Sequence, residues 1–453
     1  MNEPWKKYLP PLCAGAGVLL LAGAVWACMG LERGGRADHI TMAAALLILA
    51  ELALLLLRRE GCRWDTLLMM LLPIGAAMLA RALCLDYAGS DYNNFLSGWY
   101  QYFQENGGFG AVAHSVGDYN VPYLYFMAFI SYLSVPDLYL IKLFSLVFDV
   151  ILAWGCYRLV RSLVRERQGS RAPLAAFAAA LLLPTVVLNG ALWGQCDGIY
   201  GALCVHAAAC VLDGRNKTSV ALMALAFSFK LQAIFVLPLW GVLWLAGRVK
   251  FRELWVFPLT YLVTILPALL LGKPLADIIG IYFNQMGEYS SRLVLNAPSV
   301  YQLLPYGTQD PGYFALLGVL AAGALVLALL ALGFLLRGRL DNRLAMAMAV
   351  VLCLGVPFLL PYMHERYFFL ADVFTLCWAC VNWRRLPAAV LAEASSLASY
   401  ILYLRLKFNF TLTLGGKFYV MPLETAAMLG ALICSAVMLV RELRDHRKGL
   451  ETI

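Results

Sequence analysis

Residues 312–336 read GYFALLGVLAAGALVLALLALGFLL, an apolar stretch without Asp, Glu, Lys or Arg. A helix that crosses the hydrocarbon core of a bilayer needs about 20 such residues, so this stretch is long enough to span. Similar runs recur along the chain, and 62% of its 453 residues are hydrophobic. Only 14% are charged, against about 25% in soluble domains. The sequence therefore predicts an all-α integral membrane protein and excludes a soluble globular domain.

The basic residues indicate how the chain is oriented in the membrane. The net charge is +8, but Lys and Arg occur in short clusters between apolar runs, which is typical of topology signals and not of nucleic-acid binding. Apolar runs and basic cytoplasmic loops together predict a polytopic helical bundle of about 14 transmembrane helices with both termini cytoplasmic. The short run at 122–135 is expected to lie externally at the interface. A full crossing there would move the arginines between 158 and 171 outside.

We expect three regions along the chain. Residues 1–63 would form N-terminal transmembrane helices, 64–383 a catalytic transmembrane module, and 384–453 C-terminal helices with a basic cytoplasmic tail. Within the module, loops 85–136 and 273–311 are expected to be external and to bear interfacial helices, since 85–121 contains no Lys or Arg. The first apolar run could instead be a signal peptide, but it is long enough to span and favours a retained helix.

Four polar motifs fall on the external side of this topology. Their convergence on one face is the main indication of function, although each motif alone could be a simple turn or cap. They are Ser90–Asn94, which contains Asp91; Gly117–Pro122, with Asp118 and Tyr119; Trp193–Asp197, with Gln195; and Met363–Tyr367, with His364, Glu365 and Arg366.

Asp91 is the candidate catalytic base. It follows a membrane helix, no basic residue stands near it in the sequence, and the segment after it has the apolar spacing of an interfacial helix. Such a carboxylate could meet a lipid-borne substrate at the bilayer surface. The alternative is a solvated helix cap. Asp118 and Asp197 are weaker candidates, because turn and cap roles explain them.

The basic residues of the same face are candidate phosphate ligands. Arg366 could bind phosphate bidentately and Lys230 could act as a point charge. The alternatives are a salt bridge from Arg366 to Glu365 or another carboxylate, and snorkelling of Lys230 to the interface. His364 and Glu365 could indicate a divalent metal, but no second histidine stands at ligand spacing. We therefore predict no cofactor and leave a metal as the alternative.

The order and sidedness of these motifs resemble the GT-C superfamily of membrane glycosyltransferases, which use sugars linked to polyprenyl or dolichyl phosphate. Asp91-Tyr92 and the later Gly117–Pro122 are similar to the Asp-Tyr and Asp-Tyr-Pro-Pro elements of the endoplasmic-reticulum glucosyltransferases. His364–Arg366 resembles their His-Glu-Lys element, and Trp193–Asp197 a Gly-Gln-x-Asp element of bacterial members. Val121 replaces a proline and Arg366 a lysine, so details of the donor do not carry across.

The resemblance implies a hexosyltransferase, mannosyltransferase-like, that builds a cell-envelope glycan. It would move a sugar from a polyprenyl phosphate to a lipid, glycan or protein acceptor, with inversion, at the external face of a multi-pass cell-membrane protein. Asp91 would be the base, and Arg366, with His364 or Lys230, would stabilise the departing phosphate. Asp118, Tyr119, Gln195, Asp197 and Glu365 would be further donor or acceptor contacts. The other partners would be membrane lipids, and nucleic acid is not expected.

Two functions of other classes remain as alternatives. A lipid or sugar transporter or flippase would need polar or charged residues near mid-membrane, whereas most charges here cluster at helix ends, with Asp149 and Glu393 as unexplained exceptions. A non-catalytic scaffold of glycan assembly would tolerate the loss of Asp91. A glycan ligase or polymerase, which uses an oligosaccharide-diphosphate donor, is the nearest alternative among enzymes.

Overall fold

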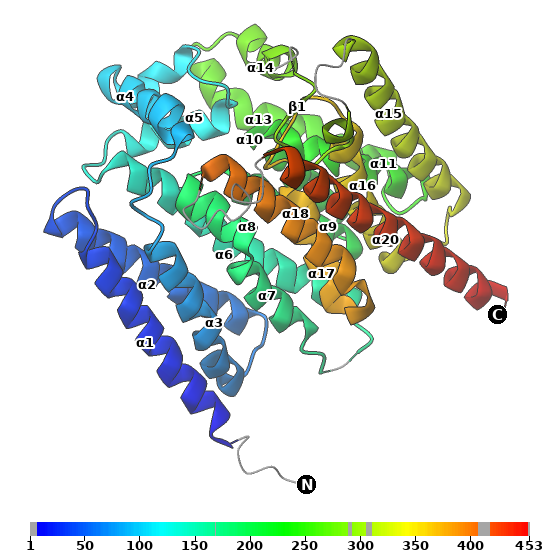
Figure 1. Ribbon diagram of the computed structural model, residues 1–453, viewed down its shortest axis with the longest axis horizontal. Helices are drawn as coiled ribbons and strands as arrows, with labels where there is room; N and C mark the ends of the chain where they lie inside the picture. Colours follow the sequence, from blue (N-terminus) through cyan, green and yellow to red (C-terminus); the bar gives the residue numbers. More distant parts are fainter. Residues whose placement is uncertain (1–6, 168, 289–291, 305–309, 406–416, 452–453) are drawn as a thin grey trace.

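The computed structural model describes residues 7–167, 169–288, 292–304, 310–405 and 417–451, and these residues form a helical bundle (Figure 1). Parts of the 273–311 loop, at 289–291 and 305–309, lie outside the described residues. Regular structure in the described part is almost entirely helical, with one short two-stranded parallel pair, β1 (Val294–Leu295) and β2 (Met363–His364). The prediction of an all-α membrane fold is confirmed.

Long apolar helices make up most of the bundle. In the described part, nine segments are long and apolar enough to cross a membrane. They are α1 (Leu9–Met29), α2 (Arg36–Arg59), α3 (Trp64–Ala82), α6 (Asp137–Leu163), α12 with α13 (Phe251–Leu254 and Val256–Leu270), α15 (Pro311–Leu335), α16 (Asn342–Leu359), η7 with α18 (Trp383–Arg385 and Leu386–Leu404), and α20 (Lys417–Glu451). The multi-pass architecture is confirmed, and the number of about 14 spans stays a prediction.

Six further short helices help to complete the bundle. They are α9 (Asp197–Leu212), α10 (Asn216–Phe229), η5 (Leu231–Phe235), α11 (Pro238–Leu245), η6 (Val300–Leu303) and α17 (Phe369–Val381).

The apolar stretch that begins at Ala172 forms a broken helix. Helix α7 (Ala172–Leu182) ends at Leu183, and α8 (Pro184–Val187) and η4 (Leu188–Trp193) continue at an angle of 45°. Pro184 explains the break, because proline disfavours a helical residue before it and cannot donate to the preceding turn. A bent pair of this kind forms either a broken span or a re-entrant loop, and Trp193 is the last residue of η4, beyond the break.

Short helices gather at one end of the molecule. They are η2 (Tyr92–Leu96), α4 (Ser97–Glu105), η3 (Gly108–Ala113), α5 (Val121–Ile130) and α14 (Leu275–Glu288). In Figure 1, α4, α5 and α14 lie near the top, whereas the N-terminal end of α1 and the C-terminal end of α20 lie in the lower half. Ten-residue α5 is about 15 Å long, half of the about 30 Å hydrocarbon core. Which end faces outward stays a prediction.

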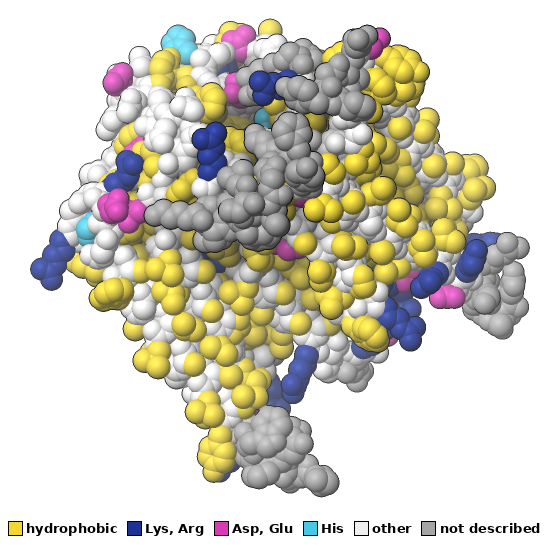
Figure 2. Space-filling model, viewed as in Figure 1, with side chains coloured by type: hydrophobic (Ala, Val, Ile, Leu, Met, Phe, Trp, Pro, Cys, Tyr) yellow, Lys and Arg dark blue, Asp and Glu magenta, His cyan; other side chains and the backbone are white. Residues whose placement is uncertain are grey.

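The flanks of the bundle expose large apolar side chains (Figure 2). Trp26 of α1 is 80% exposed and Leu335 of α15 is 75% exposed. Contiguous apolar surface of this kind is costly in water and is the surface that lipid tails solvate. The exposure therefore agrees with a protein that is surrounded by a bilayer.

Buried charges in the interior have local partners. Arg81 of α3 binds Asp149 of α6 through Nε and Nη2, at 3.0 and 2.8 Å, and its Nη1 donates to the carbonyl of Leu181 at 2.8 Å. Glu393 of α18 accepts hydrogen bonds from the backbone and hydroxyl of Thr185, at 2.9 and 2.7 Å. The two carboxylates that the sequence left unexplained therefore hold the broken α7–α8 segment in place.

A buried lysine holds the chain that leads to Asp91. The ammonium group of Lys142, in α6, donates to the carbonyls of Cys84, Leu85 and Tyr87 at 2.7–2.8 Å. These carbonyls follow the end of α3, where helical carbonyls lack intrahelical donors. Lys142 is fully buried and thus anchors the segment just before Asp91 to the bundle.

Candidate active site

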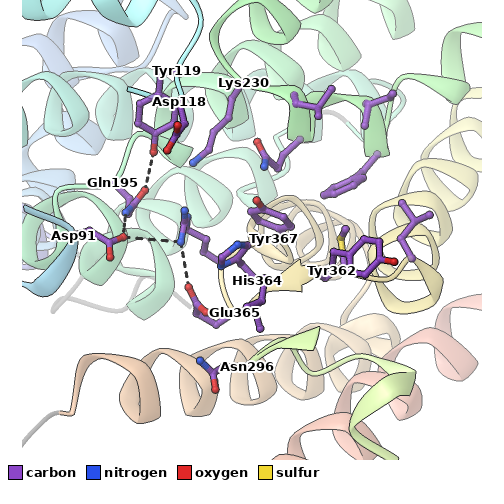
Figure 3. Close-up of a pocket in the computed structure, with 18 of the residues that line it drawn as sticks. Asp91, Asp118, Tyr119, Gln195, Lys230, Asn296, Tyr362, His364, Glu365 and Tyr367 are labelled. Atoms are coloured by element: carbon purple, nitrogen blue, oxygen red, sulfur yellow. Dashed lines mark hydrogen bonds and ion pairs between the residues drawn. The ribbon is translucent and has the colours of Figure 1, made fainter. Parts of the chain in front are cut away.

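A cavity of about 670 Å³ opens among the short helices and the β1–β2 pair. The structure brings eight of the nine predicted site residues to its wall, and the ninth, Asp197, contacts one of them. Figure 3 shows Asp91, Gln195 and Tyr119 on one side of the cavity and His364 and Glu365 on another. The eight are Asp91, Asp118, Tyr119, Gln195, Lys230, His364, Glu365 and Arg366.

Asp91 is held by three hydrogen-bond donors. Its Oδ1 accepts from the Tyr403 hydroxyl at 2.6 Å, and its Oδ2 accepts from Trp193 Nε1 at 3.0 Å and from Gln195 Nε2 at 2.5 Å. Asp91 directly precedes η2, but its side chain makes no capping hydrogen bond there. The alternative of a solvated helix cap is therefore wrong. The carboxylate is 13% exposed and faces the cavity.

Arg366 lies between two carboxylates. Its Nη1 is 3.1 Å from Glu365 Oε1 and 4.0 Å from Asp91 Oδ2, so the salt bridge weighed as an alternative is present. The pairing uses only part of the guanidinium. Within the described residues, Arg366 Nε and Glu365 Oε2 are buried without a hydrogen-bond partner. Since arginine has five donors, Arg366 can keep this bridge and still bind an oxyanion.

Burial controls the protonation of the neighbouring groups. Burial raises the pKa of the Glu365 carboxyl to about 7, with Arg366 opposing the shift and Asp91 adding to it. Burial, together with the charges of Arg366 and Lys230, lowers the pKa of His364 to about 2. His364 is therefore neutral near pH 7. It can donate a hydrogen bond to phosphate, but it cannot contribute a charge.

Lys230 points into the protein and not towards the interface. It is 4% exposed and pairs with Asp197, whose other oxygen accepts from Asn189 Nδ2 at 2.7 Å. Its ammonium also lies 5.4 Å from the centre of the Tyr119 ring, within the range of a cation–π contact. The snorkelling alternative is therefore wrong. Asp197 is the first residue of α9, and its two oxygens contact Lys230 and Asn189. Lys230 lines the cavity as half of a buried ion pair.

Asp118 and Tyr119 reach the cavity from a tight turn. Gly117 has a φ of 62°, and a Cβ there would lie 2.3 Å from the Trp99 ring, so glycine is needed for both conformation and space. The Tyr119 hydroxyl donates to Gln195 Oε1 at 3.1 Å, which orients the amide that binds Asp91. Burial raises the pKa of the Asp118 carboxyl above its usual value.

The β1–β2 pair joins the second long loop to the His364 motif. Val294 pairs with Met363 and Leu295 with His364, and the Tyr362 amide donates to the carbonyl of Leu293 at 2.8 Å. Two cavity residues next to this pair are strained, Tyr362 with a φ of 65° and Asn296 with a φ of 60°. Such strain in residues other than glycine is concentrated at functional sites.

Sequence reasoning missed Tyr403 and the role of Trp193. Tyr403 lies in α18, 312 positions from Asp91. The only local signal was the pair Tyr400 and Tyr403 at the end of an apolar helix, a spacing that places both on one face. Trp193 belonged to a motif noted for Gln195 and Asp197, and its indole nitrogen proves to bind Asp91.

The described residues offer no evident set of metal ligands. No group of three His, Cys, Asp or Glu side chains in the described part of the chain is arranged to hold a metal ion. All 12 cysteines are unpaired thiols, and eight of them are buried. A reaction without a cofactor stays a prediction.

Comparison with known proteins agrees with this geometry. A family model for glycosyltransferase family 87 (GT87) matches residues 118–359, more than half of the chain. The chain belongs to glycosyltransferase family 87. GT87 is a GT-C-type membrane family, so the resemblance found in the motifs is confirmed and the protein is a membrane glycosyltransferase. No curated protein sequence matches the chain.

The family match covers only part of the cavity. Asp118, Gln195 and Lys230 lie inside the matched range of this GT87 protein. Asp91, the His364–Arg366 motif and Tyr403 lie outside it, and they reach the cavity through the tertiary structure. The family match therefore says nothing about the roles of these residues, which rest on the geometry of this chain.

Proposed function

We propose that this GT87 protein is an inverting hexosyltransferase that uses a polyprenyl-phosphate-linked sugar as donor. The acceptor would be a hydroxyl of a lipid, glycan or protein at the external face of the cell membrane. One observation carries the proposal: the Asp91 carboxylate and the Arg366 guanidinium face the same cavity, 4.0 Å apart. A base and an oxyanion ligand are thus within reach of one reacting centre.

Asp91 would act as the general base. A carboxylate offers about four acceptor positions, and Asp91 uses three, of which only one is on Oδ1. An acceptor hydroxyl could therefore donate to Oδ1. As its oxygen bonds to the anomeric carbon, the bond from that carbon to the phosphate oxygen breaks, and the proton passes to Asp91. The products would be the glycoside and the lipid phosphate, and the proton would then leave to water.

Arg366 would stabilise the departing phosphate. It is the cation next to Asp91, and its buried Nε has no partner among the described residues. Charge-assisted hydrogen bonds from a fixed guanidinium strengthen as negative charge grows on the leaving oxygen. Lys230 would assist less, because Asp197 already balances its charge, and neutral His364 could add a hydrogen bond.

The alternatives gain no specific support. Asp149 and Glu393 are the charges that a transporter could use, and both have structural partners, in Arg81 and Thr185. A non-catalytic scaffold would not need this arrangement. Asp91 accepts three hydrogen bonds and faces the cavity beside Arg366, whose Nε has no hydrogen-bond partner among the described residues. A ligase or polymerase shares the chemistry and differs in the donor.

The test is a transfer assay with defined donors. Purified protein would be incubated with a panel of polyprenyl-phosphate sugars and membrane extract, and products would be identified by mass. We expect one donor to yield a hexosylated product together with free polyprenyl phosphate. Transfer only from nucleotide sugars, or only from oligosaccharide diphosphates, would overturn the proposed donor class.

A further inference from the structure

A small aromatic cluster lies beside Asp91, apart from the main hydrophobic core. Its buried members are Trp193, Tyr400 and Leu404, and partly buried Tyr87 and Tyr403 pack against them. The cluster joins the end of α18, the η4 turn and the segment that precedes Asp91. These three parts of the chain are far apart in the sequence, and they meet at the candidate base.

Tyr403 and Trp193 hold the Asp91 carboxylate from the same stack. Their rings lie 4.8 Å apart at an angle of 29°, which is a stacked arrangement. The Tyr403 hydroxyl donates to Oδ1 at 2.6 Å and the indole nitrogen of Trp193 donates to Oδ2 at 3.0 Å. Since each ring limits the movement of the other, the two donors fix the plane of the carboxylate.

We propose that Tyr403 is a positioning residue for Asp91, supplied by α18 beyond the range that matches GT87. This inference rests on the proposed role of Asp91 as general base. Tyr403 donates to Oδ1, the oxygen with the greater remaining capacity for an acceptor hydroxyl. It would hold this oxygen in the direction that in-line attack requires.

The surroundings make Tyr403 suitable for this role. The Tyr87 hydroxyl donates to the carbonyl of Leu404 at 2.9 Å, and the carbonyl of Tyr87 accepts from Lys142. The end of α18 and the segment before Asp91 are therefore tied to each other and to α6. A hydroxyl on a fixed helix positions a base more accurately than one on a loop.

Loss of the hydroxyl would leave Asp91 with both remaining donors on Oδ2. The carboxylate could then rotate about this anchor, and a misplacement of about 1 Å can cost about 100-fold in rate. Tyr403→Phe removes only the hydroxyl and keeps the ring stacked on Trp193. It is expected to lower kcat at least about tenfold, because the Asp91 carboxylate is then no longer held in place. KM should change by less than about twofold, since the interaction acts mainly in the transition state.

Tyr125→Phe is the matched control. It also removes one tyrosine hydroxyl, but Tyr125, in α5, donates to the carbonyl of Thr264 at 3.1 Å and does not line the cavity. We expect Tyr125→Phe to transfer sugar near the wild-type rate. An equal loss in both variants, or unfolding of Tyr403→Phe alone in a thermal melt, would show that the hydroxyl serves stability and would overturn the proposal.

The decisive measurement combines Tyr403→Phe with Asp91→Asn. If Tyr403 acts through the base, Tyr403→Phe should cause no further loss in the Asp91→Asn background, because residues that act as a unit are not additive. A tenfold loss in that background would overturn the positioning role and leave the base intact. Near-wild-type transfer by Asp91→Asn alone would instead refute the proposed base, and this inference with it.

Discussion

The interior of the bundle and the cavity use the same kinds of charged residue in opposite ways. In the interior, Arg81 is fully buried and its nitrogens bind Asp149 and the carbonyl of Leu181. In the cavity, Arg366 also meets carboxylates, but its Nε and Glu365 Oε2 have no partner within the described residues. A buried polar atom without a partner costs about 1–3 kcal/mol, so a fold retains one mainly where a ligand completes it.

This difference separates structural charges from functional ones. Arg81 and Asp149 hold α3 against α6 and the end of α7, and neither residue lines the cavity that Asp91 and Arg366 face. Asp91 and Arg366 are placed just as firmly, yet they face a space large enough for a sugar. Substitutions in the interior should therefore change stability, and substitutions in the cavity should change the rate.

Asp91→Asn should have the largest effect on the rate. The amide keeps the shape but loses the basicity, and loss of a general base costs about 10²–10⁴ in rate. Transfer by purified protein measures it, and binding of the lipid donor should survive. Asp277→Asn, in α14 outside the cavity, is the control, since Asp277 binds Ser115. Transfer by Asp91→Asn above about a third of the wild-type rate would move the search for the base to Asp118 and Asp197.

Arg81→Ala should have the largest effect on stability. It leaves Asp149 buried without its counter-charge, which costs about 3–5 kcal/mol. Thermal unfolding in detergent should show a clearly lower midpoint. The double variant Arg81→Met with Asp149→Leu should recover most of the loss, because no charge is then left unpaired. If Arg81→Ala folds normally and only loses transfer, the contrast between interior and cavity is broken.

Arg366→Ala should lower transfer about 10²–10³-fold, the range for loss of one oxyanion donor. Arg366→Lys should lose less, because a point charge partly replaces the guanidinium fork. Single-turnover rates with saturating donor measure both. Arg63→Ala provides the control, since this side chain is 87% exposed. Near-wild-type rates in both Arg366 variants would remove Arg366 from the donor site.

Ionisation of the Glu365 carboxyl should lower the free energy of unfolding as the pH rises. Burial raises its pKa to about 7 in the folded protein from the ordinary value of 4.5. Between these values the folded state holds a proton that the unfolded state has lost, so the free energy of unfolding decreases with pH. Glu365→Gln should flatten this part of a melting-temperature profile. If the wild-type protein and Glu365→Gln show the same slope, Glu365 is not the group that causes this pH dependence.

Removal of metal should have the smallest effect. The described residues provide no group of three typical ligands, and the proposed chemistry needs only Asp91 and Arg366. We expect EDTA to leave the rate of transfer unchanged. A loss that Mg²⁺ or Mn²⁺ restores would show that the cavity takes a metal after all.

Much of the membrane architecture can be predicted from the sequence. The run at 312–336 corresponds closely to α15, Pro311–Leu335. A span is a local property, because lipid forces each segment to satisfy its own backbone hydrogen bonds and to expose apolar side chains. The order of the polar motifs likewise predicted which residues would gather, and eight of nine line one cavity.

The partners of those residues were decided by the tertiary structure. Asp91 meets Tyr403 across 312 positions and Trp193 across 102, and Lys230 turns inward to Asp197. Helix packing places these groups, and it depends on the shapes of many side chains at once, which no local pattern contains. The sequence alone determined that the chain is a helical membrane protein and which polar residues gather at one cavity, whereas packing decided which of them touch.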